Sequence, residues 1–359
     1  MTLVTYTKDQ LDIVWAQQAT WGTAIADNAA IAITGGATGT YGSILDVEAT
    51  QFDPDAKQRF PDTSNSGYRW LSAPAYQLDY KGSVPSFSIV GDVKLNELPM
   101  LLYSVLQNVS EGATTPYAKT YTLTATQPDF TANAGMFMTF WEVVAIASKH
   151  HKIKDVICKK LTLTVDPSNG FGRMRFQADF VGRGLPTANT PASFWTANRT
   201  GTQARSAETF FYFHDIVLFQ AGGVDLNPGM IKYEFSNNAE PVSVDTARLA
   251  EFKGFVLGSP SWDIKATYRC LWDTNAEALR DDIGTEGVVA WVLRWGNATP
   301  GTVTGDLQVT HRGQVLKSPM VFETLNMVDF EVTGVYDGTT LPAANPLTII
   351  LADGVDRAW

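Results

Sequence analysis

Cysteines and long apolar runs are scarce in this sequence, and each scarcity excludes a class of protein. Two cysteines among 359 residues exclude a disulfide-stapled fold. Cys158 and Cys270 both stand in alternating apolar stretches, so we expect buried free thiols. The longest nearly apolar run, 136–147, is interrupted by Thr139 and Glu142 and is too short to span a bilayer.

Charge is scarce as well. Charged residues make up 18% of the chain, against roughly a quarter in typical proteins, which fits a chain that buries much of its surface against partners. Sandwiches and barrels show the same trait. The net charge of −10 argues against binding of nucleic acid, which requires clustered Lys and Arg. The first residues lack the basic and apolar regions of a signal peptide, so we expect a soluble protein made in a cytoplasm.

The sequence also lacks the known catalytic and ligand-binding motifs. The sequence contains no phosphate-binding loop, nucleophile elbow, HExxH or CxxC motif. His150 and His151 are neighbours, and neighbours in a strand point to opposite faces, so they cannot easily hold one metal ion. No pair of carboxylates stands out for glycosidase chemistry. We therefore expect no catalytic residue, no cofactor and no metal, and hence no enzyme.

Aromatic residues and period-two alternation are abundant instead, and they predict a mainly β protein. The chain has 10 Trp, 12 Tyr and 19 Phe, residues that favour strands. Alternation is clear in 87–95, 161–165, 174–180 and 231–235. Residues 167–170 (PSNG) between the second and third of these predict a hairpin turn. The range 9–18, by contrast, is predicted as a short helix.

The most informative feature is an internal repeat. Residues 82–89 (GSVPSFSI) resemble 258–264 (GSPSWDI), a match that aligns Phe87 with Trp262. Residues 176–182 (FQADFVG) resemble 328–334 (VDFEVTG) in the same way. The alternative is a chance likeness between two β domains.

A helical signal follows each matched strand. The first covers Leu98 to Val105, and the second contains Ala276, Leu279 and Ile283. We expect Thr274 or Asn275 to be the N-cap of the second helix. The first copy is longer by a segment near 107–134. The predicted organisation is an N-terminal arm (1–14), a first domain (15–184), a linker (185–204) and a second domain (205–359).

The order of these motifs resembles that of siphophage (long-tailed bacteriophage) tail tube proteins. The residues that carry the resemblance span most of the chain: 21–24 (WGTA), 82–106, 117–123 (YAKTYTL), 128–131 (PDFT), 155–182, 231–238 (IKYEFSNN) and 287–295 (GVVAWVLRW).

The resemblance implies two β-sandwich-like tail-tube domains, each with one short flanking α-helix. In that family six domains form a ring, the rings stack, and DNA passes through the lumen without specific binding. Two domains in one chain then imply a homotrimer with pseudo-sixfold symmetry, located in the virion. Further implied partners are the tape measure, tail terminator and distal tail proteins, and no membrane. The rival classes are another virion or surface structural protein, such as a decoration protein or adhesin, and a β-rich carbohydrate-binding module or enzyme.

The segment 51–68 is polar, contains Pro54, Pro61 and Gly67, and is too long for a plain hairpin turn. The resemblance implies that the corresponding long loop contacts the next ring. The residues that we expect to make this contact are Phe52, Lys57, Arg59, Phe60 and Tyr68. The alternative is a mobile surface loop.

Two basic groups stand out in this acidic chain. Residues 149–160 hold a cluster of Lys and His that is either a strand edge guarded by lysines or a contact to an acidic neighbour.

The polar face of the 160–180 hairpin carries Lys160, Arg173 and Arg175 beside Asp166 and Asp179. A lumen that lets DNA slide cannot be net positive. We therefore expect this face to look away from the lumen or to be neutralised by acidic neighbours.

Overall fold

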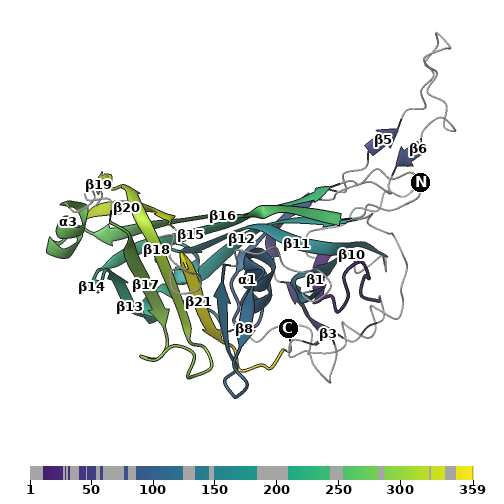
Figure 1. The fold of residues 1–359 in the computed structure, drawn as a ribbon, viewed down its shortest axis with the longest axis horizontal. Helices are drawn as coiled ribbons and strands as arrows, with labels where there is room; N and C mark the ends of the chain where they lie inside the picture. Colours follow the sequence, from purple (N-terminus) through teal and green to yellow (C-terminus); the bar gives the residue numbers. More distant parts are fainter. Residues whose placement is uncertain are drawn as a thin grey trace, which may run out of the picture.

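The computed structural model is mainly β, as the alternating sequence predicts. It describes residues 11–26, 29, 31–32, 40–45, 47–53, 57–59, 77–79, 86–123, 134–144, 149–183, 209–242, 254–281, 287–322, 325–335, 345–357 and 359. Within these residues one sheet of 19 strands joins both halves of the chain, and a sheet of two strands lies apart from it (Figure 1). Neither of the two described α-helices is long and apolar enough to cross a membrane.

The described strands and helices divide between the two halves of the chain. The first half contains β1 (Leu11–Gln17), β2 (Ile31–Ala32), β3 (Thr40–Leu45), β4 (Val47–Asp53), β5 (Lys57–Arg59), β6 (Gln77–Asp79), β7 (Ser86–Asp92), α1 (Leu98–Leu106), β8 (Val109–Glu111), β9 (Ala118–Thr122), β10 (Met138–Val144), β11 (Lys149–Val165) and β12 (Met174–Arg183). The second half contains β13 (Ile216–Ala221), β14 (Val224–Asp225), β15 (Pro228–Val242), β16 (Gly254–Leu271), α3 (Thr274–Asp281), β17 (Val289–Trp295), β18 (Leu307–Lys317), β19 (Met320–Phe322), β20 (Asn326–Gly334) and β21 (Leu347–Ala352).

A long antiparallel sheet runs across the molecule (Figure 1). Its order is β4-β7-β12-β11-β15-β16-β20, and β20 then pairs with β18 and β19. The halves meet where β11 pairs with β15, with Leu163 opposite Tyr233. We call this pairing the internal junction. It joins the two halves through continuous backbone hydrogen bonding.

Each half also folds a second layer of strands against the long sheet. The N-terminal part of β11 pairs with β10, which continues to β1 and then β3. In the second half β18 pairs with β17, which continues to β13 and then β14. Buried apolar side chains fill the space between the layers. Each half is therefore sandwich-like.

The two halves repeat one series of antiparallel pairings. The series is β3-β1-β10-β11-β12-β7-β4 in the first half and β14-β13-β17-β18-β20-β16-β15 in the second. A break in register recurs at the same step, between Val47 and Ala49 of β4 and between Pro228 and Met230 of β15. This shared order supports the predicted duplication.

The strand pairings correct the residue match on which that prediction rests. Phe176 lies opposite Gly91, while Val328, its counterpart in the repeat, lies opposite Cys270. Gly91 thus corresponds to Cys270, and the sequence match of β7 with β16 is wrong by four residues. An offset of four keeps every side chain on its own face of the sheet. Alternation therefore could not reveal the error.

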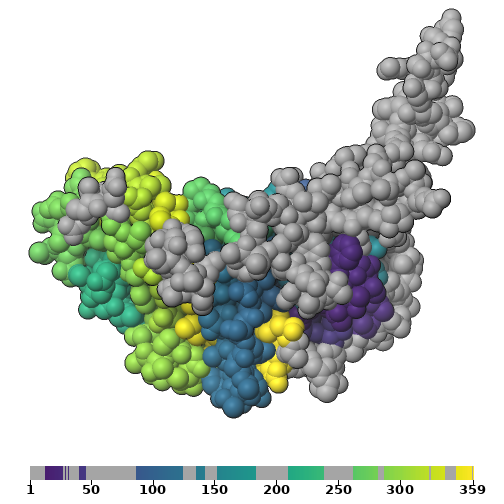
Figure 2. All heavy atoms as spheres, viewed as in Figure 1, coloured from purple at the N-terminus to yellow at the C-terminus, as the bar shows by residue number. Residues whose placement is uncertain are grey.

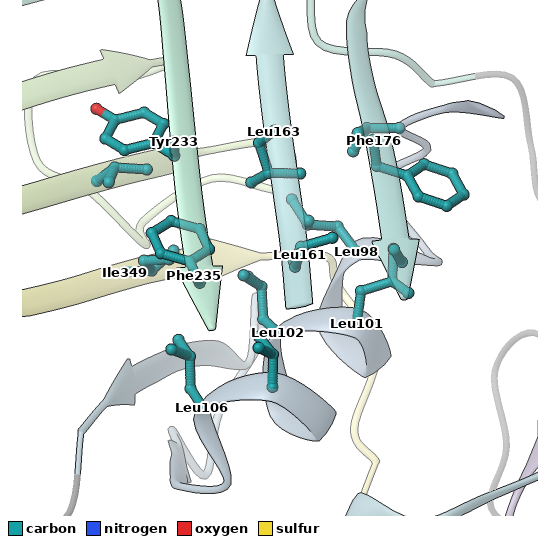
Figure 3. Packing of buried hydrophobic residues seen from close by; sticks show 14 of the residues in the cluster. Leu98, Leu101, Leu102, Leu106, Leu161, Leu163, Phe176, Tyr233, Phe235 and Ile349 are labelled. Atoms are coloured by element: carbon teal, nitrogen blue, oxygen red, sulfur yellow. The ribbon is translucent and has the colours of Figure 1, made fainter. Parts of the chain in front are cut away.

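Helix α1 packs against the long sheet beside the internal junction. All nine of its residues are buried, and its one polar side chain apart from Tyr103, Ser104, accepts the backbone N–H of Cys158 at 2.8 Å. Figure 3 shows its leucines beside residues of β11, β12 and β15: Leu98, Leu101, Leu102, Leu106, Leu161, Leu163, Phe176 and Phe235. The helix ends at Gln107, which donates its N–H to the carbonyl of Tyr103 and adopts the left-handed conformation typical of a helix C-terminus. Each fully buried leucine contributes about 1.5–3 kcal/mol relative to an exposed one.

Helix α3 forms where the sequence predicts it, but its cap is one residue earlier than expected. The carboxylate of Asp273 accepts hydrogen bonds from the backbone N–H groups of Asn275 (3.1 Å) and Ala276 (2.9 Å). Asp273 is therefore the N-cap, and the assignment to Thr274 or Asn275 is wrong. Both residues already lie inside the helix.

The helix predicted for 9–18 is wrong, because residues 11–17 form strand β1. Ile13 and Trp15 pack into the main core, while Val14 and Ala16 pack on the opposite face with Trp141. A strand buried on both faces has no alternation, and a short apolar run cannot be told from a helix by periodicity. The predicted boundary between arm and domain, at 14/15, falls inside this strand.

Other sequence predictions are confirmed. The hairpin of β11 and β12 turns at 166–173, as residues 167–170 indicate. Cys158 and Cys270 are buried free thiols, and burial raises the pKa of both. The predicted linker, 185–204, lies outside the described residues.

Candidate functional site

The solvent-facing side of the long sheet carries charged side chains from several neighbouring strands. Because side chains alternate along a strand, Leu161 and Leu163 of β11 enter the core, while Lys160, Thr162 and Thr164 face outward. The same alternation on β7, β12, β15, β16 and β20 extends this face across both halves. We call this surface the charged face.

Cations on the charged face lie beside acids from the same strand or from a neighbouring one. Lys160 of β11 lies 3.1 Å from Glu234 of β15, and Arg173 lies 3.1 Å from Asp92 of β7. In the second half Arg269 and Asp329 form a two-point contact between β16 and β20, at 2.8 and 3.0 Å. Further pairs are Lys232–Glu234, Lys265–Asp263 and Lys317–Glu331.

These contacts shift the pKa of Glu234, Arg173 and Lys265 toward the charged form. A hydrogen bond from Lys232 holds the pKa of Glu234 below its ordinary value. The hydrogen bond to Asp92 raises the pKa of Arg173, and that to Asp263 raises the pKa of Lys265. Both signs of charge therefore persist at neutral pH. The exposed pairs Lys265–Asp263 and Lys317–Glu331 add little stability, so their main effect is to remove net positive charge from the surface.

The sequence of the β11–β12 hairpin contains fewer acidic residues than this face carries in the folded chain. Asp92 and Glu234 come from β7 and β15, which flank the hairpin only after the chain has folded. Asp179 of the hairpin accepts a hydrogen bond from Ser88 of β7. Acidic neighbours of the kind expected from the sequence thus lie beside Lys160 and Arg173.

The structure describes three of the five residues expected to contact a second ring. Phe52 lies in β4 opposite Phe87. Lys57 and Arg59 lie in β5, which pairs with β6 in the separate two-stranded sheet (Figure 1). Phe60 and Tyr68 lie outside the described residues.

The segment 51–68, predicted from the sequence to be a long loop, contains regular structure. Its first residues complete β4, and 57–59 form β5. Strand β6, at 77–79, belongs to the same insertion between β4 and β7. This insertion is therefore longer than predicted and carries a two-stranded sheet of its own.

Two lysines of the basic cluster bind the chain's own N-terminal loop. Lys152 donates to the carbonyl of Ile25 (3.0 Å), and Lys154 donates to that of Gly22 (3.3 Å). The buried carboxylate of Asp155 accepts the backbone N–H of Gly22 at 2.8 Å. This part of the cluster thus has a structural role that neither sequence interpretation proposed. The side chains of His150 and His151 are not described, and the described residues contain no group of metal ligands.

A buried ionic cluster that the sequence does not predict lies near the C-terminus. Asp353 lies 2.5 Å from Lys119 and accepts a hydrogen bond from Arg357 Nε at 2.9 Å, and all three side chains are fully buried. Glu111 adds a second contact to Lys119, at 2.8 Å. The guanidinium of Arg357 lies 3.7 Å from the ring centroid of Tyr41, a cation–π contact.

This cluster connects the end of the second half to the first half. Strand β21 pairs with both β18 and β9, so it bridges the halves at a second place. Figure 2 shows the yellow C-terminal residues beside the blue surface that includes β8 and β9. No sequence signal points to the cluster, because Lys119 and Asp353 are 234 residues apart.

Comparison with known protein families and with curated proteins finds no match to this chain.

Proposed function

We propose that the chain is the structural protein of a bacteriophage tail tube, which polymerises into stacked rings and forms a passive conduit for DNA. The observation that carries the proposal is the long sheet, built from the same series of pairings twice, with a charged face on which cations lie beside acids. A tube wall needs a repeated unit that joins edge to edge, and ring closure covers sheet edges that would otherwise be exposed.

The charge distribution supports a conduit rather than a nucleic-acid binder. Each phosphate that pairs with Lys or Arg adds salt-dependent affinity, and several such contacts per ring would stop DNA from sliding. On the charged face, Lys160 and Arg173 already have acidic partners. Three chains together would carry a net charge of −30.

The proposed assembly is a homotrimeric ring with pseudo-sixfold symmetry, located in the virion. The proposed partners are other copies of the chain and the tape measure, tail terminator and distal tail proteins. The proposed role is mechanical, with no catalytic residue, cofactor or metal.

Negative-stain microscopy of the purified chain, over a range of concentrations, tests the proposal. Rings with a central hole, or tubes made of stacked rings, are the expected particles. Monodisperse single chains at every concentration would contradict it and would favour a decoration protein, an adhesin or a carbohydrate-binding module. Sedimentation velocity on the same samples gives an independent mass.

A further inference from the structure

The long sheet ends in two edges that together match the internal junction. At one end, β4 pairs only with β7 among the described strands. At the other end, β19 pairs only with β20 in that part of the chain. The repeated pairings make β4 the counterpart of β15, and they make β18 with β19 the counterpart of β11. The two edges are therefore second copies of the two strands that already pair at the internal junction.

The strand registers fix which residues correspond. Leu163 of β11 and Met320 of β19 lie opposite Phe176 and its counterpart Val328. The break in register between Cys158 and Lys160 recurs between Val315 and Lys317. Along β4 and β15, the shared break aligns Thr50 with Ile231 and Phe52 with Tyr233.

Two residues that occupy equivalent positions in the two halves differ strongly in the solvent exposure of their side chains. Val165 of β11 and Phe322 of β19 occupy the same place in the repeat, opposite Met174 and Asn326. Val165 lies opposite Ile231 of β15 and is 1% exposed, whereas Phe322 is 78% exposed. A large apolar side chain is thus left open at the place where the internal junction supplies a covering strand.

We infer that β4 of one chain pairs antiparallel with the β18–β19 edge of a second copy of the same chain, repeating the internal junction. The inference rests on the proposed ring assembly and names the surface that closes it. Its register places Phe322 opposite Thr50, Val321 opposite Gln51, and Met320 opposite Phe52. Phe52, expected from the sequence to contact a second ring, then takes the place of the buried Tyr233 within one ring.

Charge complementarity supports the same register. At the internal junction Lys160 pairs with Glu234 at 3.1 Å. Lys317 and Asp53 are the counterparts of these two residues, so they would meet across the boundary between chains. The side chain of Lys317 is 70% exposed and already contacts Glu331, as expected for a cation at an open edge.

Pro319 does not block this edge. Its carbonyl oxygen accepts the N–H of Asp329 on β20, at 3.0 Å. In an antiparallel pair the N and O atoms of one residue point to the same neighbour, so the missing N–H of Pro319 also faces β20. Met320 and Phe322 therefore direct their N–H and carbonyl groups toward the open side. The edge keeps the donors that a partner strand needs.

A pair of cysteines tests the inference directly. Val321 and Gln51 would form a non-hydrogen-bonded pair, with Cα atoms about 4.5 Å apart, within the range that a disulfide requires. The double variant Gln51→Cys/Val321→Cys should oxidise to a covalent ring that runs as three chains on a non-reducing gel. A mixture of the two single variants should give covalent pairs and nothing larger, because each chain then has one reactive edge. The native cysteines are buried, so each single variant alone should give no disulfide-linked product.

A charge substitution gives a second readout. Phe322→Glu should leave the chain folded, because the side chain is exposed, and should abolish the ring in sedimentation velocity. Phe171→Glu is the matched control, since Phe171 is 91% exposed and lies in the turn between β11 and β12. That variant should keep the ring mass of the unmodified chain.

The outcomes separate this inference from the proposed function. Rings of the unmodified chain, together with no disulfide in the double variant and intact rings in Phe322→Glu, would overturn the inference and leave the tube proposal standing. An unmodified chain that stays monomeric at every concentration would overturn both. Covalent pairs from the mixed single variants would establish the head-to-tail pairing.

Discussion

At the scale of single residues, His311 is a buried neutral group with a consequence for acid stability. The hydroxyl of Tyr268 lies 3.1 Å from its Nδ1, and burial lowers the pKa of His311 from 6.5 to about 4. As the pH falls below 6.5, the unfolded chain therefore takes up a proton that the folded chain does not. The stability that this group contributes is complete above pH 6.5 and is lost as the pH falls toward 4.

We expect the free energy of unfolding to fall by about 2 kcal/mol between pH 7 and pH 5 because of His311. His311→Gln removes this titration, so the drop should be smaller by that amount in the variant. Denaturant titrations of both proteins at the two pH values measure the difference. Equal slopes against pH in the two proteins would show that His311 is accessible to protons in the folded state.

The buried ionic cluster gives a second prediction at this scale. Asp353→Asn removes the carboxylate that contacts Lys119 and Arg357, and removing one member of a buried ion pair costs about 3 kcal/mol or more. Asp263→Asn is the control, because its pair with Lys265 is exposed and should contribute almost nothing. Chemical denaturation measures both. A small effect of Asp353→Asn, equal to that of the control, would contradict the structural role assigned to the cluster.

At the scale of elements, local patterns predicted some elements and failed for others. The hairpin at 161–180 and helix α1 follow from alternation and from a run of leucines. Strand β1 could not be predicted from such patterns, because Val14 and Ala16 face a second core that includes Trp141 of β10. Which strand covers a second face is decided by folding and leaves no period in the sequence.

The candidate site was predicted less well, for the same reason. The sequence showed the cations of the hairpin, but their acidic partners come from β7 and β15. The four-residue error in the repeat kept every side chain on its correct face, so only the strand pairings exposed it. The correspondence of Phe322 with Val165, which supports the second-copy interface, therefore needed the structure.

The insertion between β4 and β7, which carries β5 and β6, gives a prediction at the scale of elements. Deleting 54–66 removes β5 but leaves β4, β7 and the core in place. The variant should fold, with the far-ultraviolet circular dichroism of a β protein, and its subunits should no longer polymerise into tubes. Normal tubes from the variant in negative stain would refute the inter-ring contact expected of Lys57, Arg59 and Phe60, the three expected contact residues that the deletion removes.

At the scale of the whole molecule, the acids of the charged face should keep DNA from adhering. The variant Asp92→Asn/Glu234→Gln/Asp329→Asn leaves Arg173, Lys160 and Arg269 without these carboxylates. We expect its assemblies to retain DNA at low salt and to release it as salt rises, while assemblies of the unmodified chain retain none. Filter binding across a salt series measures this. Equal retention by both proteins would show that paired charge on this face does not prevent binding.

We propose that this chain builds a tube from rings in which each chain supplies two equivalent units. Cryo-electron microscopy of its assemblies with helical reconstruction tests this proposal, because it counts the chains in each ring. We expect three chains around a central channel, with pseudo-sixfold symmetry from the two halves of each chain. A ring of six whole chains, or an assembly without a channel, would contradict it.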